Sequence, residues 1–493
     1  MKILLIYPEF PVTHWNFKHV LKLVAKKATE PPLGLITVAS MLPKDWERKL
    51  VDMNVGRLKD SDIEWADMVF ISGMIIQKKS FDQTVQRCKK LGVRVVAGGP
   101  MVTEQPENYP EPDHLILNEA EITLLPFLED LTAGNPKRVY SSDVFPDITS
   151  TPIPDWSLLD MKRYVTMDLQ YSRGCPFNCE FCSITALFGH RPRVKTAQQF
   201  IAELESLYNA GWCGHVFIVD DNFIGNKRYL KSDLLPGIIE WQKAHGYPFS
   251  FNTEVSINLA DDEELMDLMA DSGFTACFVG IETPDDESLS ECGKTQNRGI
   301  NMIDSVKRMQ RKGLNVSAGF IVGFDSDDED IFERQFNFIQ KSGIVNAMVG
   351  LLSAPFGTRL YKRLEAENRI IEDPSGDNVD GSLNFKPKMN PDILIRNYKS
   401  LVKKIYSPKY FMERLATFLL EYKISDIKFG KSNKNIVSTA VRVFLRLGIF
   451  QSKGKRCFWK TIRTTITKYP KKITTAVTLL VYGLHFRKVA DKL

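Results

Sequence analysis

Six short apolar runs recur between residues 167 and 372, and segments with helical periodicity separate them. The runs are LQYSRG, HVFIVDDN, FSFNTEVS, ACFVGIET, NVSAGFIVGFD and NAMVGLL, and the helical segments include AQQFIAELESLYNA and GINMIDSVKRMQRKG. Strands that alternate with amphipathic helices form parallel sheets covered by those helices. The pattern therefore predicts a TIM-type partial (β/α)6 barrel, two units short of a closed eight-unit barrel.

The rest of the chain divides into three further parts. Residues 1–135 alternate in the same way, from KILLIYP to ITLLPFLEDL, which predicts a Rossmann-like α/β domain with a parallel sheet. Residues 136–166 contain VFPDITSTPIPDWSLLD, where recurring prolines leave no period, and we interpret them as a linker. Residues 373–493 are predicted to be α-rich and basic, because residues 401–493 carry 21 Lys and Arg against 4 Asp and Glu. The predicted fold class is α/β.

A chain of 493 residues with 43% hydrophobic residues can bury several ordinary cores. Its first apolar run ends at Tyr7 and Pro8 without a cleavage pattern, and no apolar segment is long enough to span a bilayer, which predicts a cytoplasmic protein. Eight cysteines are too few for a disulfide scaffold in a chain of this length. Only Cys175, Cys179 and Cys182 lie close together in the sequence.

These three cysteines have the spacing C-x3-C-x2-C and follow the first predicted strand of the barrel. That place is the carboxyl edge of the sheet, where such barrels assemble active sites. Thiolates bind soft metals and iron–sulfur clusters, so three interpretations compete: cysteines buried in a core, a zinc site completed by His190, or a cubane cluster with one iron left open. Gly174, Pro176 and Asn178 indicate a loop, which favours the cluster over a core. We do not expect His190 to be a ligand.

The C-x3-C-x2-C spacing with Phe181 before the last cysteine resembles the signature of the radical S-adenosylmethionine (SAM) enzymes, and the predicted partial barrel follows it. The resemblance implies a [4Fe-4S] cluster bound by Cys175, Cys179 and Cys182, whose open iron chelates the amino and carboxylate groups of SAM. It also implies that an electron, supplied by an electron donor, cleaves SAM to a 5′-deoxyadenosyl radical. The cofactors then carry the chemistry, and the protein positions them in a dry cavity.

The same resemblance places contacts to SAM at the ends of the barrel strands. Carboxylates and carboxamides accept hydrogen bonds from an ammonium and from ribose hydroxyls, and glycines let adenine approach the backbone. For each residue the alternative is an ordinary turn, helix cap or strand glycine. The expected contacts are Phe181, Asp220, Asp221, Asn222, Glu254, Glu282, Gly319 and Gly323.

The first predicted domain lacks the G-x-G-x-x-G fingerprint of dinucleotide-binding proteins after its first strand. Small residues instead follow its later strands, and this arrangement resembles the cobalamin-binding domain of cobalamin-dependent radical SAM enzymes. The D-x-H-x-x-G motif that supplies a histidine to cobalt in other cobalamin proteins is absent, so the lower cobalt face has no expected ligand. The alternative is a domain without a ligand. The expected contacts are Ser72, Gly73, Met74, Gly98, Gly99, Pro100, Asn118 and Glu119.

Both cofactors in one chain imply a class B methyltransferase: the 5′-deoxyadenosyl radical abstracts hydrogen from an unactivated sp3 carbon, and methylcobalamin supplies the methyl group. The chain looks most like the subgroup that contains the hopanoid C-2 methylase and the methylase of a glutamine α-carbon in methyl-coenzyme M reductase. We expect a protein or peptide substrate ahead of a hopanoid-type lipid. The alternatives are a cobalamin radical enzyme that does not methylate and, from a different class, a zinc-stapled binding protein.

The basic C-terminal region contains ITTAVTLLVYGLHF, 14 largely apolar residues flanked by Lys471, Lys472, Arg487 and Lys488. The segment is too short to span a bilayer. It fits either an interfacial helix, which would give peripheral membrane contact, or a helix packed on the barrel with a solvated basic face, which is the more frequent case. A basic surface also suits an acidic protein partner. No RNA-binding motif is present, and we expect no nucleic-acid partner.

Overall fold

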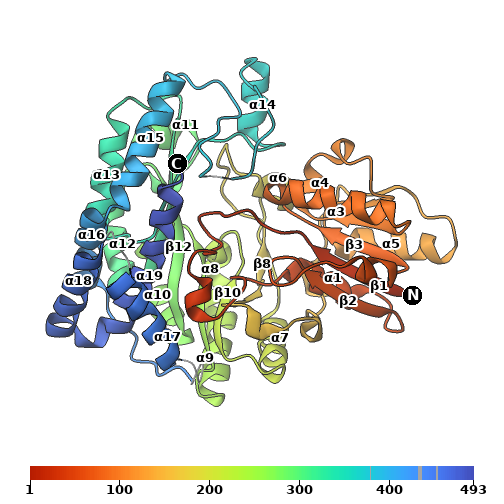
Figure 1. The fold of residues 1–493 in the computed structure, drawn as a ribbon, viewed down its shortest axis with the longest axis horizontal. Coiled ribbons are helices and arrows are strands. Elements are labelled where there is room, and N and C mark those ends of the chain that lie inside the picture. The colour runs from red at the N-terminus through yellow and green to blue at the C-terminus, as the bar shows by residue number, and fades with distance from the viewer. Residues whose placement is uncertain (378, 431–435, 451–453) are drawn as a thin grey trace.

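Two parallel sheets form the framework of the protein (Figure 1). The computed structural model describes residues 1–377, 379–430, 436–450 and 454–493. The first sheet has the strand order β2-β1-β3-β4-β5-β6, and the second has the order β14-β13-β12-β11-β10-β7. All neighbouring strands in both sheets are parallel. The prediction of an α/β fold is therefore confirmed.

The central strands of the first sheet, β1 and β3, are buried on both faces, which explains why they are continuous apolar runs rather than alternating ones, whereas β2 (ERKLVD) at the edge is largely charged. In β1, Leu4 and Ile6 pack in one core while Ile3 and Leu5 pack in another, and all four are fully buried. The last strand, β6, lies beyond residue 135, within the segment interpreted as a linker. The strands are β1 (Lys2–Tyr7), β2 (Glu47–Asp52), β3 (Met68–Ser72), β4 (Arg94–Gly98), β5 (His114–Ile116) and β6 (Val139–Tyr140), and the helices are α1 (Leu33–Met41), α2 (Asp60–Glu64), α3 (Lys78–Lys90), α4 (Pro100–Glu104) and α5 (Ala120–Thr132).

The second sheet places its six strands in chain order, as expected for a partial barrel. A separate antiparallel pair, β8 (Ser172–Arg173) with β9 (Arg193–Val194), lies just after the first of these strands. The barrel strands are β7 (Met167–Leu169), β10 (Gly214–Ile218), β11 (Phe249–Val255), β12 (Phe274–Glu282), β13 (Asn315–Val322) and β14 (Ala347–Leu351). The helices of this part are α6 (Ile184–Phe188), α7 (Ala197–Asn209), α8 (Lys227–Tyr229), α9 (Leu235–Ala244), α10 (Glu263–Ser272), α11 (Asp286–Glu291), α12 (Met302–Arg311), α13 (Ile331–Ser342) and α14 (Arg359–Ala366).

Short helical turns connect these elements. Ten are 3-10 turns: η1 (Leu21–Val24), η2 (Ile75–Gln77), η3 (Pro106–Asn108), η4 (Ile148–Ser150), η5 (Trp156–Leu158), η6 (Met161–Arg163), η7 (Phe223–Asn226), η9 (Ile257–Asp261), η10 (Thr295–Asn297) and η12 (Pro470–Lys472). Two are π-helical turns: η8 (Leu230–Leu234) and η11 (Phe444–Phe450).

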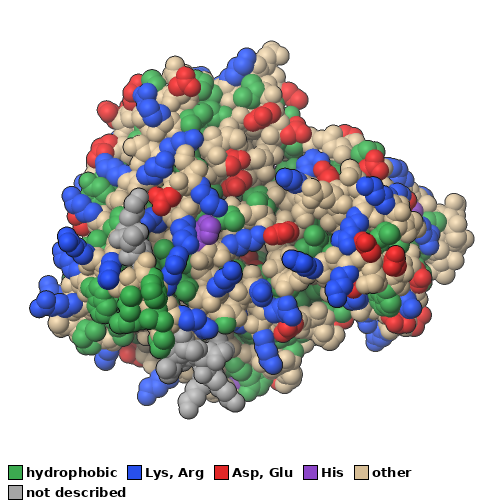
Figure 2. Space-filling model, in the orientation of Figure 1, with side chains coloured by type: hydrophobic (Ala, Val, Ile, Leu, Met, Phe, Trp, Pro, Cys, Tyr) green, Lys and Arg blue, Asp and Glu red, His purple; other side chains and the backbone are tan. Residues whose placement is uncertain are grey.

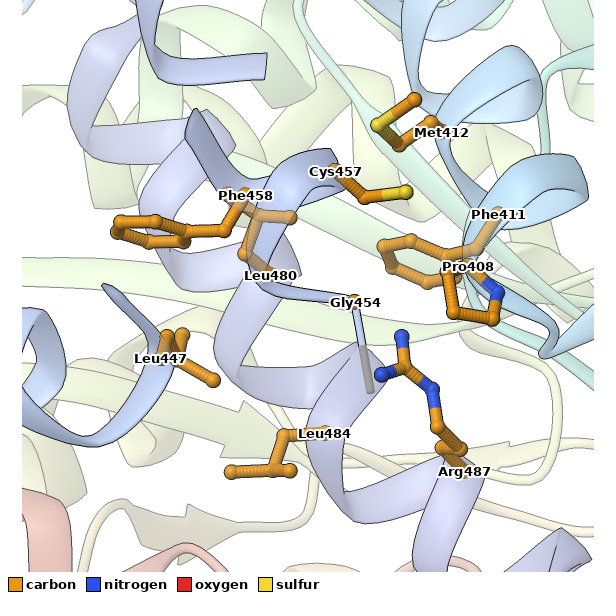
Figure 3. Close-up of a pocket in the computed structure, with 10 residues that line it drawn as sticks. All are labelled: Pro408, Phe411, Met412, Leu447, Gly454, Cys457, Phe458, Leu480, Leu484 and Arg487. Carbon is orange, nitrogen blue, oxygen red and sulfur yellow. The ribbon is translucent and has the colours of Figure 1, made fainter. Parts of the chain in front are cut away.

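The C-terminal region is helical, as predicted, and its helices lie on the side of the barrel opposite the first sheet (Figure 1). Figure 2 shows many Lys and Arg side chains over this face. A cavity of about 20 Å3, enough for one water molecule, lies among Pro408, Phe411, Leu484 and Arg487 (Figure 3). The helices are α15 (Pro391–Ile405), α16 (Pro408–Glu421), α17 (Ile436–Val443), α18 (Lys455–Lys468) and α19 (Ile473–Ala490).

The apolar segment ITTAVTLLVYGLHF lies in α19, which packs against α15, α16 and α18. Ten residues of α19 are buried, including Leu479, Leu484 and Phe486. The packed alternative is therefore the one that the structure shows, and the interfacial alternative for this segment is wrong because its apolar face is already covered. In the part of the chain that the structure describes, no helix is long and apolar enough to cross a membrane.

A long segment, Pro8 to Pro32, leaves the first sheet after β1 and reaches the barrel and the C-terminal helices before α1 begins (Figure 1). We call it the crossing segment. Its Trp15 ring packs edge-on against Phe278 of β12, with 5.2 Å between ring centroids. Its His14 ring stacks on Phe486 of α19 at 4.2 Å. The crossing segment thus connects three parts of the chain that the sequence presents as separate.

Candidate functional site

The three cysteines lie in one loop between β8 and α6, at the carboxyl edge of the barrel. All three are half-buried. Burial raises the pKa of the Cys182 thiol to about 12, and the neighbouring Cys179 and Cys175 add to the shift. Burial also raises the pKa values of Cys175 and Cys179. The thiols are therefore close enough to influence one another, and they need a positive partner, such as iron, to become thiolates.

The cysteine loop is held by its backbone. Gly174 has φ +91°, and a side chain there would meet the carbonyl oxygen of Gly189 at 2.9 Å. The amide of Cys175 donates to the same carbonyl at 3.3 Å, and the amide of Glu180 donates to the carbonyl of Cys292 at 2.8 Å. Only glycine fits at the start of this loop, because the position combines a left-handed backbone with close carbonyl groups.

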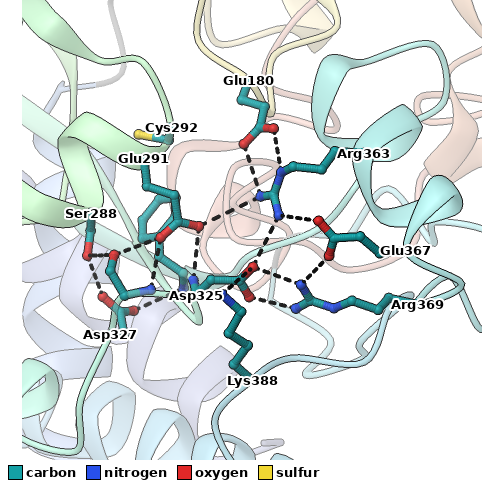
Figure 4. A network of polar contacts seen from close by, with 12 residues as sticks. Glu180, Ser288, Glu291, Cys292, Asp325, Asp327, Arg363, Glu367, Arg369 and Lys388 are labelled. Carbon is teal, nitrogen blue, oxygen red and sulfur yellow. Dashed lines mark hydrogen bonds and ion pairs between the residues drawn. The ribbon is translucent and has the colours of Figure 1, made fainter.

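A polar network fixes the middle of the loop (Figure 4). Glu180, which stands between Cys179 and Cys182, accepts two hydrogen bonds from Arg363 of α14 at 2.7 and 3.1 Å. Arg363 and Arg369 both reach Asp325, which follows β13. Two-pronged contacts between arginine and carboxylate restrict orientation as well as distance. The loop that carries the cysteines is thereby tied to the last unit of the barrel.

His190, the candidate fourth ligand of a zinc site, follows α6 by two residues. Its side chain is exposed. Within the described ranges, no three or more His, Cys, Asp and Glu residues are grouped so as to hold a metal ion.

Two of the expected SAM contacts are occupied by the protein itself. Asp220 is 1% exposed and accepts hydrogen bonds from the Tyr171 amide at 2.7 Å and the Ser172 hydroxyl at 2.6 Å. Burial raises the pKa of Asp220 to about 6. The side-chain oxygen of Asn222 accepts from the amide of Ser256 at 3.2 Å. Both residues tie neighbouring loops together.

Asp221 and Glu254 are the acids left for a ligand. Burial, with Asp220 nearby, raises the pKa of Asp221 to about 7. Burial, with Asp221 and Glu30 of the crossing segment nearby, raises the pKa of Glu254 to about 8. The Oδ2 atom of Asp221 is buried and has no hydrogen-bond partner. A cationic ligand would lower both pKa values and supply the missing donor.

Glu282 pairs with Lys294, a residue that the sequence analysis did not select. The two side chains meet at 2.5 Å, and a side chain at Gly280 would collide with both. Burial alone would lower the pKa of Lys294, but Glu282 and Cys179 raise it. Lys294 therefore places a positive charge beside the cysteine loop. Its own sequence context, a loop after an acidic helix, gave no signal for this role.

The remaining expected contacts around SAM lie near the same edge. The Phe181 ring packs 6.4 Å from that of Phe324. A side chain at Gly319 would meet the Phe278 ring at 3.0 Å. Gly323 has φ +106°, and a side chain there would meet Leu394 at 3.2 Å. In this structure both glycines make room for neighbouring side chains.

The barrel interior carries polar groups without partners. Side chains alternate along β11: Phe249, Phe251 and Thr253 are buried, while Asn252 and Glu254 keep accessible surface. Asp168 of β7 lies in the same register layer as Asn252. The buried acceptor atoms without a partner include Asp168 Oδ1, Asp221 Oδ2, Asn252 Oδ1 and Gln296 Oε1. Because buried polar groups are normally satisfied, these acceptors fit the ammonium and hydroxyl donors of SAM.

The carboxyl edge of the first sheet is built from small residues in close contact. Gly99 has φ +94° and a side chain there would meet Ser72 Oγ and the carbonyl of Gly73. A side chain at Gly98 would meet the carbonyl of Ile116 at 3.2 Å. Pro100 begins α4, and Met74 is 43% exposed beyond β3. This edge offers backbone and one exposed thioether side chain, which suits a flat, apolar ligand face.

The last two expected cobalamin contacts differ from each other. Asn118 is exposed, with φ +60°, and its side-chain oxygen accepts from the Ser142 amide. Glu119 is buried, and both of its carboxylate oxygens are taken by Arg173 at 2.6 Å and Arg193 at 2.7 Å. Glu119 therefore joins two parts of the chain.

Glu119, Glu121, Arg173 and Arg193 form what we call the domain clamp. Arg173 also pairs with Glu121 at 2.8 Å, and the two acids are only 3% and 4% exposed. Glu119 and Glu121 follow β5 of the first sheet, whereas Arg173 precedes Cys175 by two residues. The clamp thus places the carboxyl edge of the first sheet beside the cysteine loop.

Comparison with known proteins agrees with this architecture. Residues 169–339 match the Radical SAM superfamily, and residues 358–493 match a domain of unknown function (DUF4070). An uncharacterised methyltransferase of Synechocystis sp. is 40% identical over 99% of this chain and 91% of its own length. The hopanoid C-2 methylase of Rhodopseudomonas palustris is 34% identical over 93% of this chain and 88% of its own length.

Solved structures share the fold at low sequence identity. The radical SAM methyltransferase TsrM from Kitasatospora setae has a TM-score of 0.63 at 14% identity, over 94% of this chain and 99% of its own. The cobalamin-dependent SAM radical enzyme OxsB has a TM-score of 0.62 at 15% identity, over 99% of this chain and 84% of its own. Two methyltransferases thus match nearly the whole chain, and its barrel matches the radical SAM model. The chain belongs to the radical SAM methyltransferases.

Proposed function

We propose that the protein is a cobalamin-dependent radical SAM C-methyltransferase that methylates an unactivated sp3 carbon. The observation that supports this most directly is the domain clamp, because Glu119 after β5 meets Arg173 beside the cysteine loop. Through it the carboxyl edges of the two sheets face the same region. Parallel sheets of this kind bind ligands at those edges, so a cofactor held by each would lie close to the other.

In the barrel, Cys175, Cys179 and Cys182 would hold the [4Fe-4S] cluster of the family and leave one iron without a protein ligand. Asp221 and Glu254 would accept hydrogen bonds from the SAM ammonium and hydroxyls, since Asp221 Oδ2 has no partner in the protein. Lys294 would balance the negative charge of the thiolates. When bound, the cluster and SAM supply a radical that removes hydrogen, with the electron taken from a donor protein.

In the first domain, the residues from Ser72 to Met74 and from Gly98 to Pro100 would lie against the corrin ring. Their backbone atoms are the part of this edge that a flat ligand could reach, because Glu119 is committed to the domain clamp. When bound, cobalamin would carry the methyl group that is transferred. The solved structures of TsrM and OxsB, which share this fold, contain bound cobalamin. The lower cobalt face has no assigned ligand in this proposal.

For the substrate we propose a polycyclic lipid of the hopanoid type. The support is the relative named hopanoid C-2 methylase, which matches this chain at 34% identity over 93% of its length. A protein substrate, the first expectation from the sequence, is the second candidate. Residues 401–493 carry 21 basic and 4 acidic residues, and this positive charge would favour an acidic protein as the substrate.

The test is an anaerobic reaction of the reconstituted full chain with cobalamin, SAM, an electron donor and either hopanoid lipid or acidic peptides. We expect mass spectrometry to find one added methyl group on the lipid, and none when cobalamin is omitted. Formation of 5′-deoxyadenosine without methylated product would contradict the proposal and favour a cobalamin enzyme that does not methylate. Methylated peptide with unchanged lipid would select the protein substrate. Cys179→Ala removes one of the three cysteines proposed to hold the cluster. Cys213→Ala, at an exposed single cysteine, is its matched control.

A further inference from the structure

Large apolar side chains are exposed together on α17, η11 and α18, far from the first sheet (Figures 1 and 2). Phe444 and Trp459 contact each other with 5.3 Å between ring centroids. Exposed groups of large apolar side chains mark interaction sites. We call this group the apolar surface, and its members, between 41% and 69% exposed, are Val441, Phe444, Ile449, Phe450, Trp459 and Ile466.

The side chains of the apolar surface cannot be buried within the protein itself. On α18 the inward positions Phe458, Thr461 and Thr465 are buried, while Trp459 and Ile466, seven residues apart, face outward. The Trp459 indole donates to the carbonyl of Gly448 at 3.1 Å, which joins α18 to η11. The cavity beneath these helices has a volume of only about 20 Å3 (Figure 3). The outward side chains therefore cannot fold inward.

The segment that carries the apolar surface has charge of one sign. Residues 427–490 contain 15 Lys and Arg and no Asp or Glu. The exposed basic residues on η11 and α18 are Arg446, Lys455, Arg456, Lys460, Arg463 and Lys468. No ion pair involves any of these six side chains among the residues that the structure describes. On α18, Arg456, Lys460 and Arg463 follow the helical spacing next to Trp459 and Ile466, so apolar and basic groups share one outward face.

We propose that the apolar surface docks on an anionic lipid bilayer. Such a surface supplies hydrocarbon for Phe450 and Ile466 and negative charge for the surrounding Lys and Arg at the same time. Trp459 adds an exposed aromatic ring, of the kind that membrane interfaces favour, while its N–H is satisfied within the protein by the Gly448 carbonyl. The proposal gives a task to the region that matches the domain of unknown function, residues 358–493. It does not depend on the reaction or on the substrate.

Flotation of the full holoenzyme with vesicles tests the proposal. The vesicles are phosphatidylcholine alone and phosphatidylcholine with phosphatidylglycerol. We expect flotation with the anionic vesicles at about 0.1 M NaCl and much less at about 1 M, where the screening length falls from about 10 to 3 Å. Phe450→Glu and Ile466→Glu should each weaken binding roughly tenfold, since each removes an apolar side chain from the lipid and adds repulsion.

Two matched controls separate this surface from general effects. Leu125→Glu changes a side chain that is 60% exposed on α5, and it should leave flotation unchanged. Arg456→Glu with Lys460→Glu should weaken flotation roughly tenfold, whereas Lys90→Glu with Lys243→Glu, at exposed lysines elsewhere, should not. Circular dichroism checks that each variant is folded, and the two apolar variants are independent of each other.

Absence of flotation with anionic vesicles, or equal losses in Ile466→Glu and Leu125→Glu, would overturn the proposal. Sedimentation analysis adds a further outcome. A dimer of the free protein that Ile466→Glu dissociates would assign the surface to a second copy of the chain and would also overturn it.

Discussion

The carboxyl edges of the two sheets are built from opposite kinds of residue. In the barrel, Asp168 and Asn252 in the interior and Asp221 at the edge present buried acceptor atoms without partners. At the edge of the first sheet, Gly98 and Gly99 pack against neighbouring groups, and the buried acids Glu119 and Glu121 are paired with arginines. The difference indicates that a ligand at the barrel must bring positive charge and hydrogen-bond donors, whereas a ligand at the first sheet must bring a flat face.

The largest effect is expected at the barrel edge. Cys179→Ala removes one of three thiols, so the cluster should not assemble and methylation should be abolished. The measurement is the broad visible absorption of an iron–sulfur protein after anaerobic reconstitution, together with product formation. Cys213→Ala should retain both, because Cys213 is exposed and single. Full absorption in Cys179→Ala would show that this cysteine is not a ligand.

Breaking the connection between the two edges comes next. Glu119→Gln leaves Arg193 without a carboxylate partner and Arg173 with Glu121 alone, and it should lower the free energy of unfolding by about 3 kcal/mol. Denaturant unfolding measures the change. Glu107→Gln, at an exposed acid of the same domain, should change it by less than about 0.5 kcal/mol. Equal values for the two variants would mean that the domain clamp carries no stability.

Gly99→Ala tests the carboxyl edge of the first sheet. The variant combines a strained backbone with contact to Ser72 Oγ, and we expect a loss of about 2 kcal/mol in unfolding free energy. Gly211 has a similar φ, +89°, with no atom within 4 Å of the added carbon, so Gly211→Ala isolates the backbone strain at about 1 kcal/mol. Adding Ser72→Ala to Gly99→Ala should recover the difference. If the unfolding free energy is not recovered, the group that the added carbon meets is the backbone of Gly73 and not Ser72.

The smallest effect is a pH dependence at the barrel edge. The folded pKa of Glu254 is about 8, above its ordinary value of 4.5, because of burial and nearby acids. Between these two pH values the folded protein holds a proton that the unfolded chain releases, so stability falls as pH rises. Because the side chain is partly accessible, the wild type should lose only about 1 kcal/mol more than Glu254→Gln between pH 6 and pH 8. Parallel pH curves for the two proteins would contradict the raised pKa.

Much of the fold was predictable because hydrophobic periodicity reports which face of a strand or helix is buried. Five of the six barrel strands and the helical C-terminal region appear where the pattern predicted them, whereas β7 overlaps the predicted run LQYSRG at Leu169 alone. The crossing segment was not recognised, since IYPEFPVTHWN has no period and its partners, Phe278 and Phe486, are hundreds of residues away. β6 was missed because two residues are too short for a pattern.

The site was predictable only where spacing carries the chemistry. Three cysteines within eight residues share one loop in any fold, so their proximity followed from the sequence. Asp220 and Glu119 illustrate the limit. Their position after a strand was predicted, but the partners that occupy them, Ser172 and Arg173, come from other strands. Lys294 was missed because a single lysine in a loop has no pattern, and its role depends on Glu282, twelve residues earlier.

The crossing segment sets an order on the making of this protein. The carbonyl groups of Thr13 and His14 accept from the His485 ring, whose position in the chain is 472 and 471 residues later. At a synthesis rate of about 5–20 residues per second, the ribosome delivers that partner roughly half a minute to a minute and a half after the crossing segment. The first sheet and the barrel, including the contact of Trp15 with Phe278, can form during this interval, but the contacts to His485 and Phe486 cannot form before α19 exists. The crossing segment therefore makes its last contacts, those that join it to the C-terminal helix, only when synthesis of the chain is nearly complete.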